Sequence, residues 1–96
     1  MPLNHLENLE LQDLEKSAGE LLHEIAASAR DASDKDLLKL ESIAERAAKI
    51  AFGADRADLL TDQMYNLIKW TDHLDDEVMR LRFLKALNDR PLVAPW

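Results

Sequence analysis

The spacing of apolar residues in the second half of the chain constrains the fold more than any other feature. The residues on this spacing are Leu60, Met64, Leu67, Thr71, Leu74, Val78 and Leu81. They follow alternating steps of four and three residues over three heptads, which places them along one side of an α-helix. No glycine or proline interrupts the segment. The spacing therefore predicts one long helix over about residues 55–88, roughly 50 Å in length at 1.5 Å per residue.

A break in this helix at Thr71-Asp72 is the alternative. Four acidic residues follow within the next turn and a half, namely Asp72, Asp75, Asp76 and Glu77. Acidic residues are typical of the first turn of a helix, where the helix dipole favours negative charge. We favour a continuous helix because the heptad spacing passes through Thr71 unchanged. Arg90 and Pro91 are expected to end it, since proline cannot continue a helix.

A first helix is predicted over about residues 6–29. Its apolar stripe consists of Leu11, Leu14, Ala18, Leu21 and Ile25. Asn4 is a suitable N-cap, and Glu7 follows three residues later, as in a capping box. Arg30 to Asp34 then break the apolar pattern, and a short turn between helices favours an antiparallel neighbour.

A second helix is predicted over about residues 35–52, with Ser33 or Asp34 as its cap. Its core side consists of Leu37, Leu40, Ala44, Ala47 and Ala51. The alanines allow a close approach of neighbouring backbones, so we expect this helix to lie at the centre of the fold. Gly53 is expected to follow the helix with a positive φ, and Asp55 to cap the third helix.

These elements predict the fold class: an all-α, antiparallel three-helix bundle with a long third helix, expected to self-associate. The 96 residues form a single domain, 1–96, because a chain of this length supports one modest core. The low content of glycine and proline and the 47% of hydrophobic residues also favour packed helices.

The end of the third helix is the predicted contact surface. It overhangs the two shorter helices and carries a second apolar set around Trp70 and Phe83, away from the heptad side. A helix that is apolar on more than one face needs more than one neighbour. The apolar tail, residues 91–96, is expected to fold back onto this helix or to meet a partner. The predicted partner or self-association residues are Trp70, Leu74, Val78, Leu81, Leu84, Leu87 and Trp96.

The predicted function is a non-enzymatic protein-protein interaction module: a small cytoplasmic adaptor, inhibitor or regulator that acts through helix packing and forms a homodimer. Arg80, Arg82 and Lys85 are expected to pair with the acidic first helix of another subunit. There is no cysteine, no glycine-rich phosphate loop, and no histidine placed locally to activate a serine. We therefore expect no enzyme activity and no cofactor. The sequence shows no apolar run long enough for a membrane span and no secretion signal.

Two histidine motifs have the spacing of metal ligands. Glu20-x-x-His23 matches the motif of carboxylate-bridged helical bundles, and His73 lies four residues before Glu77. At 100° per residue, both histidines turn away from the apolar stripes of their helices. We therefore expect both to lie on the surface and expect no metal site.

The acidic first helix supports an alternative function. The chain has a net charge of −7, and residues 1–32 contain seven acidic and two basic residues. This charge disfavours direct binding to nucleic acid. It suits an inhibitor of a nucleic-acid-binding protein, with phosphate-like acids at Glu7, Glu10, Asp13, Glu20 and Glu24.

A second alternative treats His23 as the phosphoacceptor of a phosphorelay module. LLHEIAASAR is slightly similar to the histidine phosphotransfer modules, which are helical bundles with an exposed histidine. In that family a lysine and a glycine typically follow the histidine, whereas Glu24, Ile25 and two alanines follow it here. We also considered a helix-turn-helix around Gly53, but Asp55, Asp58 and Asp62 disfavour entry into a DNA groove.

Overall fold

All the regular secondary structure in the part of the chain that the structure describes is helical. A computed structural model describes residues 4–28, 31–89, 91–93 and 95. These residues form four α-helices and one 3-10 helix, and none of them lies in a β-strand. The predicted all-α class is therefore confirmed, and α1, α2 and α3 pack as a helical bundle.

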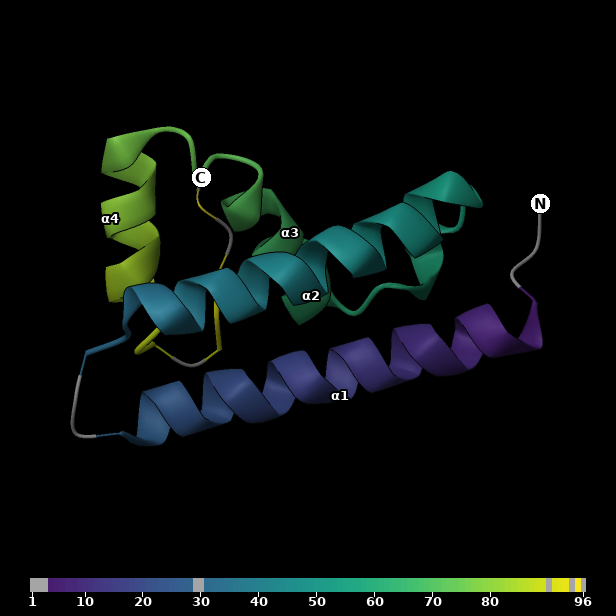
Figure 1. Ribbon diagram of the computed structural model, residues 1–96, viewed down its shortest axis with the longest axis horizontal. Helices are drawn as coiled ribbons and strands as arrows, with labels where there is room; N and C mark the ends of the chain where they lie inside the picture. The colour runs from purple at the N-terminus through teal and green to yellow at the C-terminus, as the bar shows by residue number, and fades with distance from the viewer. Residues whose placement is uncertain (1–3, 29–30, 90, 94, 96) are drawn as a thin grey trace.

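The two N-terminal helices begin at the predicted caps. α1 spans His5–Ala27, and Glu7 N donates to Asn4 Oδ1 at 2.8 Å while Asn4 N donates to Glu7 Oε1. α2 spans Asp34–Gly53, where Ser33 and Asp36 form the same reciprocal arrangement. Each capping box satisfies backbone N–H groups that have no partner inside the helix. Figure 1 shows α2 running back alongside α1.

α2 ends differently from the prediction. Gly53 is the last residue of the helix, and the left-handed conformation lies two residues later, at Asp55 with φ 55°. Arg56 N donates to Ala51 O at 2.7 Å and Asp55 N donates to Phe52 O. These two bonds form a Schellman motif, in which aspartate tolerates the left-handed position better than most side chains. Asp55 therefore ends α2 and does not cap the next helix.

The prediction of one continuous third helix is wrong, and the alternative, a break at Thr71-Asp72, is confirmed. The segment contains η1 (Ala57–Leu59), α3 (Asp62–Thr71) and α4 (Glu77–Ala86). α3 begins where Met64 N donates to Thr61 Oγ1, and α4 begins where Val78 N and Met79 N donate to Asp76 Oδ1. Two local caps thus replace intrahelical bonds that a continuous helix would make. A continuous helix would also exceed the molecule's longest dimension, 40 Å.

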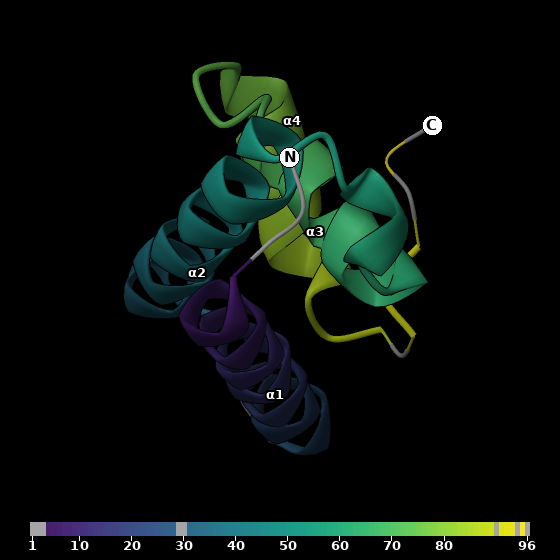
Figure 2. The ribbon, with the colours of Figure 1, turned by 90° about the vertical axis from the view of Figure 1, so that its right-hand side faces the viewer.

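α2 lies at the centre of the arrangement. It packs extensively against both α1 and α3. Seen nearly end-on in Figure 2, α1, α2 and α3 occupy three corners. α4 crosses the direction of α1 and α2 beside the start of α2 (Figure 1). All five predicted core positions of α2 are buried, in accord with its central place.

The core side of α1 is shifted from its predicted position. Leu11, Ala18 and Ile25 are buried as predicted, but Leu14 and Leu21 are only half-buried, and Leu22 is buried instead. Leu22 lines a small cavity between α1 and α3 together with Met64 and Leu67. The buried side of α1 is turned toward α3 because α1 faces both α2 and α3. The spacing of apolar residues in α1 predicts one buried side and does not reveal that α3 covers part of the next one.

Candidate interaction surface

The structure divides the predicted contact residues into three groups. Trp70 and Leu87 are buried within the chain, at 5% and 1% exposure, and Leu74 and Leu84 are partly buried against the same core. Val78 and Leu81 are exposed, at 58% and 55%. Trp96 lies outside the described residues. Among the predicted contact residues that the structure describes, only Val78 and Leu81 remain more than half exposed.

The aromatic pair between α3 and α4 sets the orientation of α4. The rings of Trp70 and Phe83 are stacked, with centroids 5.4 Å apart and an angle of 18° between their planes. Phe83 is completely buried, and Leu87 follows it one turn later on the same side. Arg80 Nη1 also donates to Asp34 Oδ1 at 3.1 Å, which ties α4 to the start of α2. Because these residues face inward, Val78 and Leu81 face outward.

We define the outer face of α4 as Glu77, Val78, Leu81, Arg82 and Lys85. All five residues are exposed. The acidic member lies in the first turn of α4 and Lys85 in the last turn, as the helix dipole favours. Two apolar side chains lie between charges of opposite sign, so this face has an apolar centre with one acid at its N-terminal end and two bases at its C-terminal end.

Leu92 and Val93 of the C-terminal tail lie against α3, which agrees with the expectation that the tail folds back onto this helix. Leu92 is buried in the core. Asn66 Nδ2 donates to Leu92 O at 3.2 Å, and Trp70 Nε1 donates to Val93 O at 2.7 Å. Two side chains one helical turn apart on α3 thus hold two successive carbonyls of the tail. Trp70 consequently serves the intrachain fold through both its ring and its N–H group.

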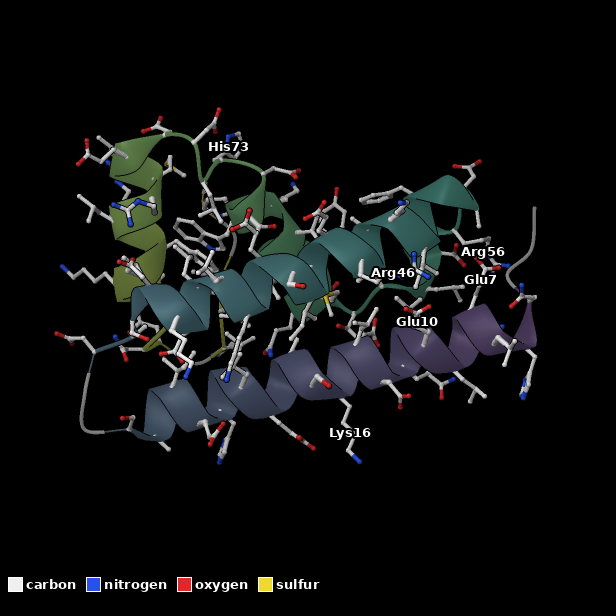
Figure 3. All side chains as sticks on the ribbon, in the orientation of Figure 1. Glu7, Glu10, Lys16, Arg46, Arg56 and His73 are labelled. Carbon is white, nitrogen blue, oxygen red and sulfur yellow. The ribbon has the colours of Figure 1, made fainter. Side chains whose placement is uncertain are left out.

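Several acids of α1 are engaged within the chain. Both carboxylate oxygens of Glu10 accept from Arg46 of α2, at 2.8 Å each, and Figure 3 shows the two side chains pointing toward each other. This hydrogen-bonded guanidinium lowers the pKa of Glu10 below its usual value. Glu15 Oε1 accepts from Thr61 N at 3.1 Å, and Glu7 belongs to the capping box. The acidic surface of α1 is therefore smaller than the sequence suggests.

The histidine motifs lie at the surface. Glu20 and His23 are both exposed, as their positions on the helical wheel predict. His73 lies in the turn between α3 and α4, where it is half-buried (Figure 3). Within the described residues, no three or more histidine, aspartate or glutamate side chains are grouped to hold a metal ion. No helix among the same residues has the length and apolar character needed to cross a membrane.

Sequence analysis missed other exposed apolar residues. Leu6 and Leu9 near the start of α1 are exposed, and so is Leu38 of α2 at 64%. They could have been found from the sequence, because they are apolar residues that lie outside the predicted apolar stripes of their helices. An open hollow between α1 and α2 also has a mixed lining that includes Glu20, Glu24 and Lys39. None of these sites combines two exposed apolar residues with charges of opposite sign at its two ends.

Comparisons with known proteins identify no relative of this chain. No protein-family model matches the chain, and neither the curated proteins nor the solved structures include a significant match.

Proposed function

We propose that this chain is a cytoplasmic, non-enzymatic protein-protein interaction module that acts through helix packing, with the outer face of α4 as its contact surface. One observation carries the proposal: Val78 and Leu81 are both more than half exposed and lie three residues apart on one helix face. Residues three apart are neighbours on a helix surface, so the two side chains form one apolar patch.

The opposite side of α4 strengthens the argument. Phe83 and Leu87 already fill the inward side, so α4 does not need Val78 or Leu81 for its own packing. Scattered exposed apolar residues are normal in proteins, whereas a helix with apolar residues on opposite sides needs a second neighbour. Helix-packing partners supply such a neighbour, and large aliphatic side chains contribute to these contacts.

The experiment replaces the apolar patch with charge. We expect Val78→Asp/Leu81→Asp to keep its helical circular dichroism and to lose binding to its partner. The partner is captured from the native host and identified by mass spectrometry, and self-association is measured by sedimentation. Leu38→Asp is the matched control, because Leu38 is equally exposed but lies on α2. Capture and self-association that survive in the α4 variant, or that fail equally in the control, would overturn the proposal.

The acidic-inhibitor alternative has less support. Of the five acids predicted for this surface, Glu7 and Glu10 already bind groups of this chain, and Asp13, Glu20 and Glu24 are exposed. An inhibitor that mimics phosphates needs acids free to meet a basic partner. Binding that collapses with added salt and is unaffected by Val78→Asp/Leu81→Asp would favour this alternative.

A further inference from the structure

A row of three residues along the outer face of α4 has the charge pattern of a self-complementary surface. Glu77, Leu81 and Lys85 are spaced four residues apart and are all exposed. Residues at this spacing lie one above another on a helix, so the row presents an acid, an apolar residue and a base in sequence. The acid and the base lie roughly 12 Å apart, at 1.5 Å per residue, with Leu81 midway between them.

Within the described residues, neither Glu77 nor Lys85 forms an ion pair. Ion pairs elsewhere in the described chain include Glu10 with Arg46, Asp58 with Arg56, and Asp34 with Arg80. Arg80, on the same helix, is therefore already engaged with the start of α2. Within the part of the chain that the structure describes, Glu77 and Lys85 remain available to an outside group.

We propose that the occupant of this face is a second copy of the chain, with the two α4 helices packed antiparallel about a two-fold axis that passes next to Leu81. This inference rests on the proposed function and names its partner. In this register Leu81 meets Leu81 of the partner subunit. Glu77 then lies opposite Lys85 of the partner subunit, and the two-fold axis repeats that pair at the other end.

The charge pattern selects the antiparallel register. Parallel helices with the same register would place like charges beside each other at both ends, which is unfavourable. In the antiparallel register both ends are attractive and the apolar centre is shared. Val78 lies one turn before Arg82 on the same face and extends the apolar centre.

The expected dimer is weak. α4 has ten residues and is thus roughly 15 Å long, so the contact is smaller than the about 800 Å² per partner of a stable complex. We expect a dissociation constant of about 100 µM, which sedimentation and NMR can measure. At low micromolar concentration the chain should be monomeric.

The decisive experiment uses two opposite charge reversals. Glu77→Lys alone and Lys85→Glu alone each turn two attractive pairs into two repulsive ones, so each should raise the dissociation constant of the homodimer about tenfold. When the two variants are mixed, every cross pair becomes attractive again. We therefore expect the mixture to form a heterodimer about as strong as the wild-type homodimer.

NMR follows this mixture directly. Glu77→Lys labelled with ¹⁵N and titrated with unlabelled Lys85→Glu should show shifts confined to α4 and its neighbours. Lys49→Glu is the control, because it makes the same charge change at an exposed position of α2. Circular dichroism checks that each variant is folded. If a charge reversal frays α4, the neutral variants Glu77→Gln and Lys85→Gln are used in place of the two reversals. Each neutral variant should weaken the homodimer severalfold.

The outcomes separate this inference from the proposed function. A wild-type chain that stays monomeric at about 1 mM, or a mixture that forms no heterodimer, would overturn the antiparallel self-pairing. The proposed function would still stand if Val78→Asp/Leu81→Asp abolished binding to a different protein. If neither self-association nor any other binding depended on α4, both would be wrong.

Discussion

α2 and α4 both begin at a side-chain cap, yet they differ in how completely they are covered. α2 is buried along its whole core side, because α1 and α3 flank it. α4 buries Phe83 on one side and leaves Val78 and Leu81 exposed on the other. The comparison shows that the number of neighbours decides which apolar residues of a small helical domain are buried. A central helix has two neighbours, whereas α4 has one covered side.

The largest difference in stability is expected between a substitution on the inward side of α4 and one on its outer face. We expect Phe83→Ala to lower the free energy of unfolding by about 3–5 kcal/mol, because it empties a fully buried site and removes the stack on Trp70. Leu81→Ala should change it by about 0.5 kcal/mol or less. Urea denaturation at low micromolar concentration measures both.

The ratio of these two effects tests the orientation of α4. Similar losses in both variants would mean that the outer face of α4 is buried within the chain. The comparison with α2 would then fail, since α4, like α2, would be covered by neighbours on two sides.

The next effect tests the close packing of α2. Ala47→Leu should cost about 1–3 kcal/mol, because Ala47 is fully buried and added methylene groups force its neighbours apart. The same substitution at Ala27, which is exposed at the end of α1, should be nearly neutral. Thermal and urea unfolding of the two variants provide the test, and equal stabilities would show that α2 is not tightly enclosed.

A smaller effect tests the break between α3 and α4. Asp76→Ala removes the side chain that accepts from Val78 N and Met79 N, which should cost about 1 kcal/mol. Asp75→Ala, one residue earlier and exposed, is the control and should have little effect. A rise in both stability and helix content on removing Asp76 would indicate that the segment prefers the continuous helix.

The smallest effect concerns the ion pair that joins α1 and α2. The pKa of Glu10 is lowered by its hydrogen bonds to Arg46, so folding favours the ionised carboxylate. This contribution is fully present above the ordinary glutamate pKa and is lost as the pH falls through the lowered pKa of the folded state. We expect Glu10→Gln to be slightly less stable than wild type near neutral pH and equally stable in acid.

Urea midpoints between about pH 7 and about pH 3 measure this difference. Asp58→Asn is the control: the pKa of Asp58 is also lowered by an arginine, Arg56, but that partner is only two residues away. A local pair can form in the unfolded chain as well, so its removal should change stability less. A larger effect at Asp58 would contradict the long-range role of the Glu10 pair.

The two N-terminal helices could be predicted from the sequence almost completely. Asn4 with Glu7 and Ser33 with Asp36 are local signals, because each cap joins residues three apart. The buried side of α2 was also predictable, since a central helix buries the side on which its apolar residues recur. The buried Leu22 was not predictable from α1 alone, because α3 lies against it.

The candidate site was predicted only in part. Val78 and Leu81 were among the predicted contact residues and are exposed, and their contact with a partner stays a prediction. Trp70 and Leu87 were expected at the same surface but are enclosed by the chain. The reason is the turn before Asp76, which rotates α4 away from the heptad side of α3.

The sequence by itself determined that the chain is helical, where α1 and α2 begin, and which side of α2 is buried. These properties depend on local hydrogen bonds and on the period of one helix. Only the tertiary structure decided that α3 and α4 are separate and which side of α4 faces solvent. The heptad spacing and the cap at Asp76 favour opposite local structures, and the stacking of Phe83 on Trp70 is possible only after the chain has turned.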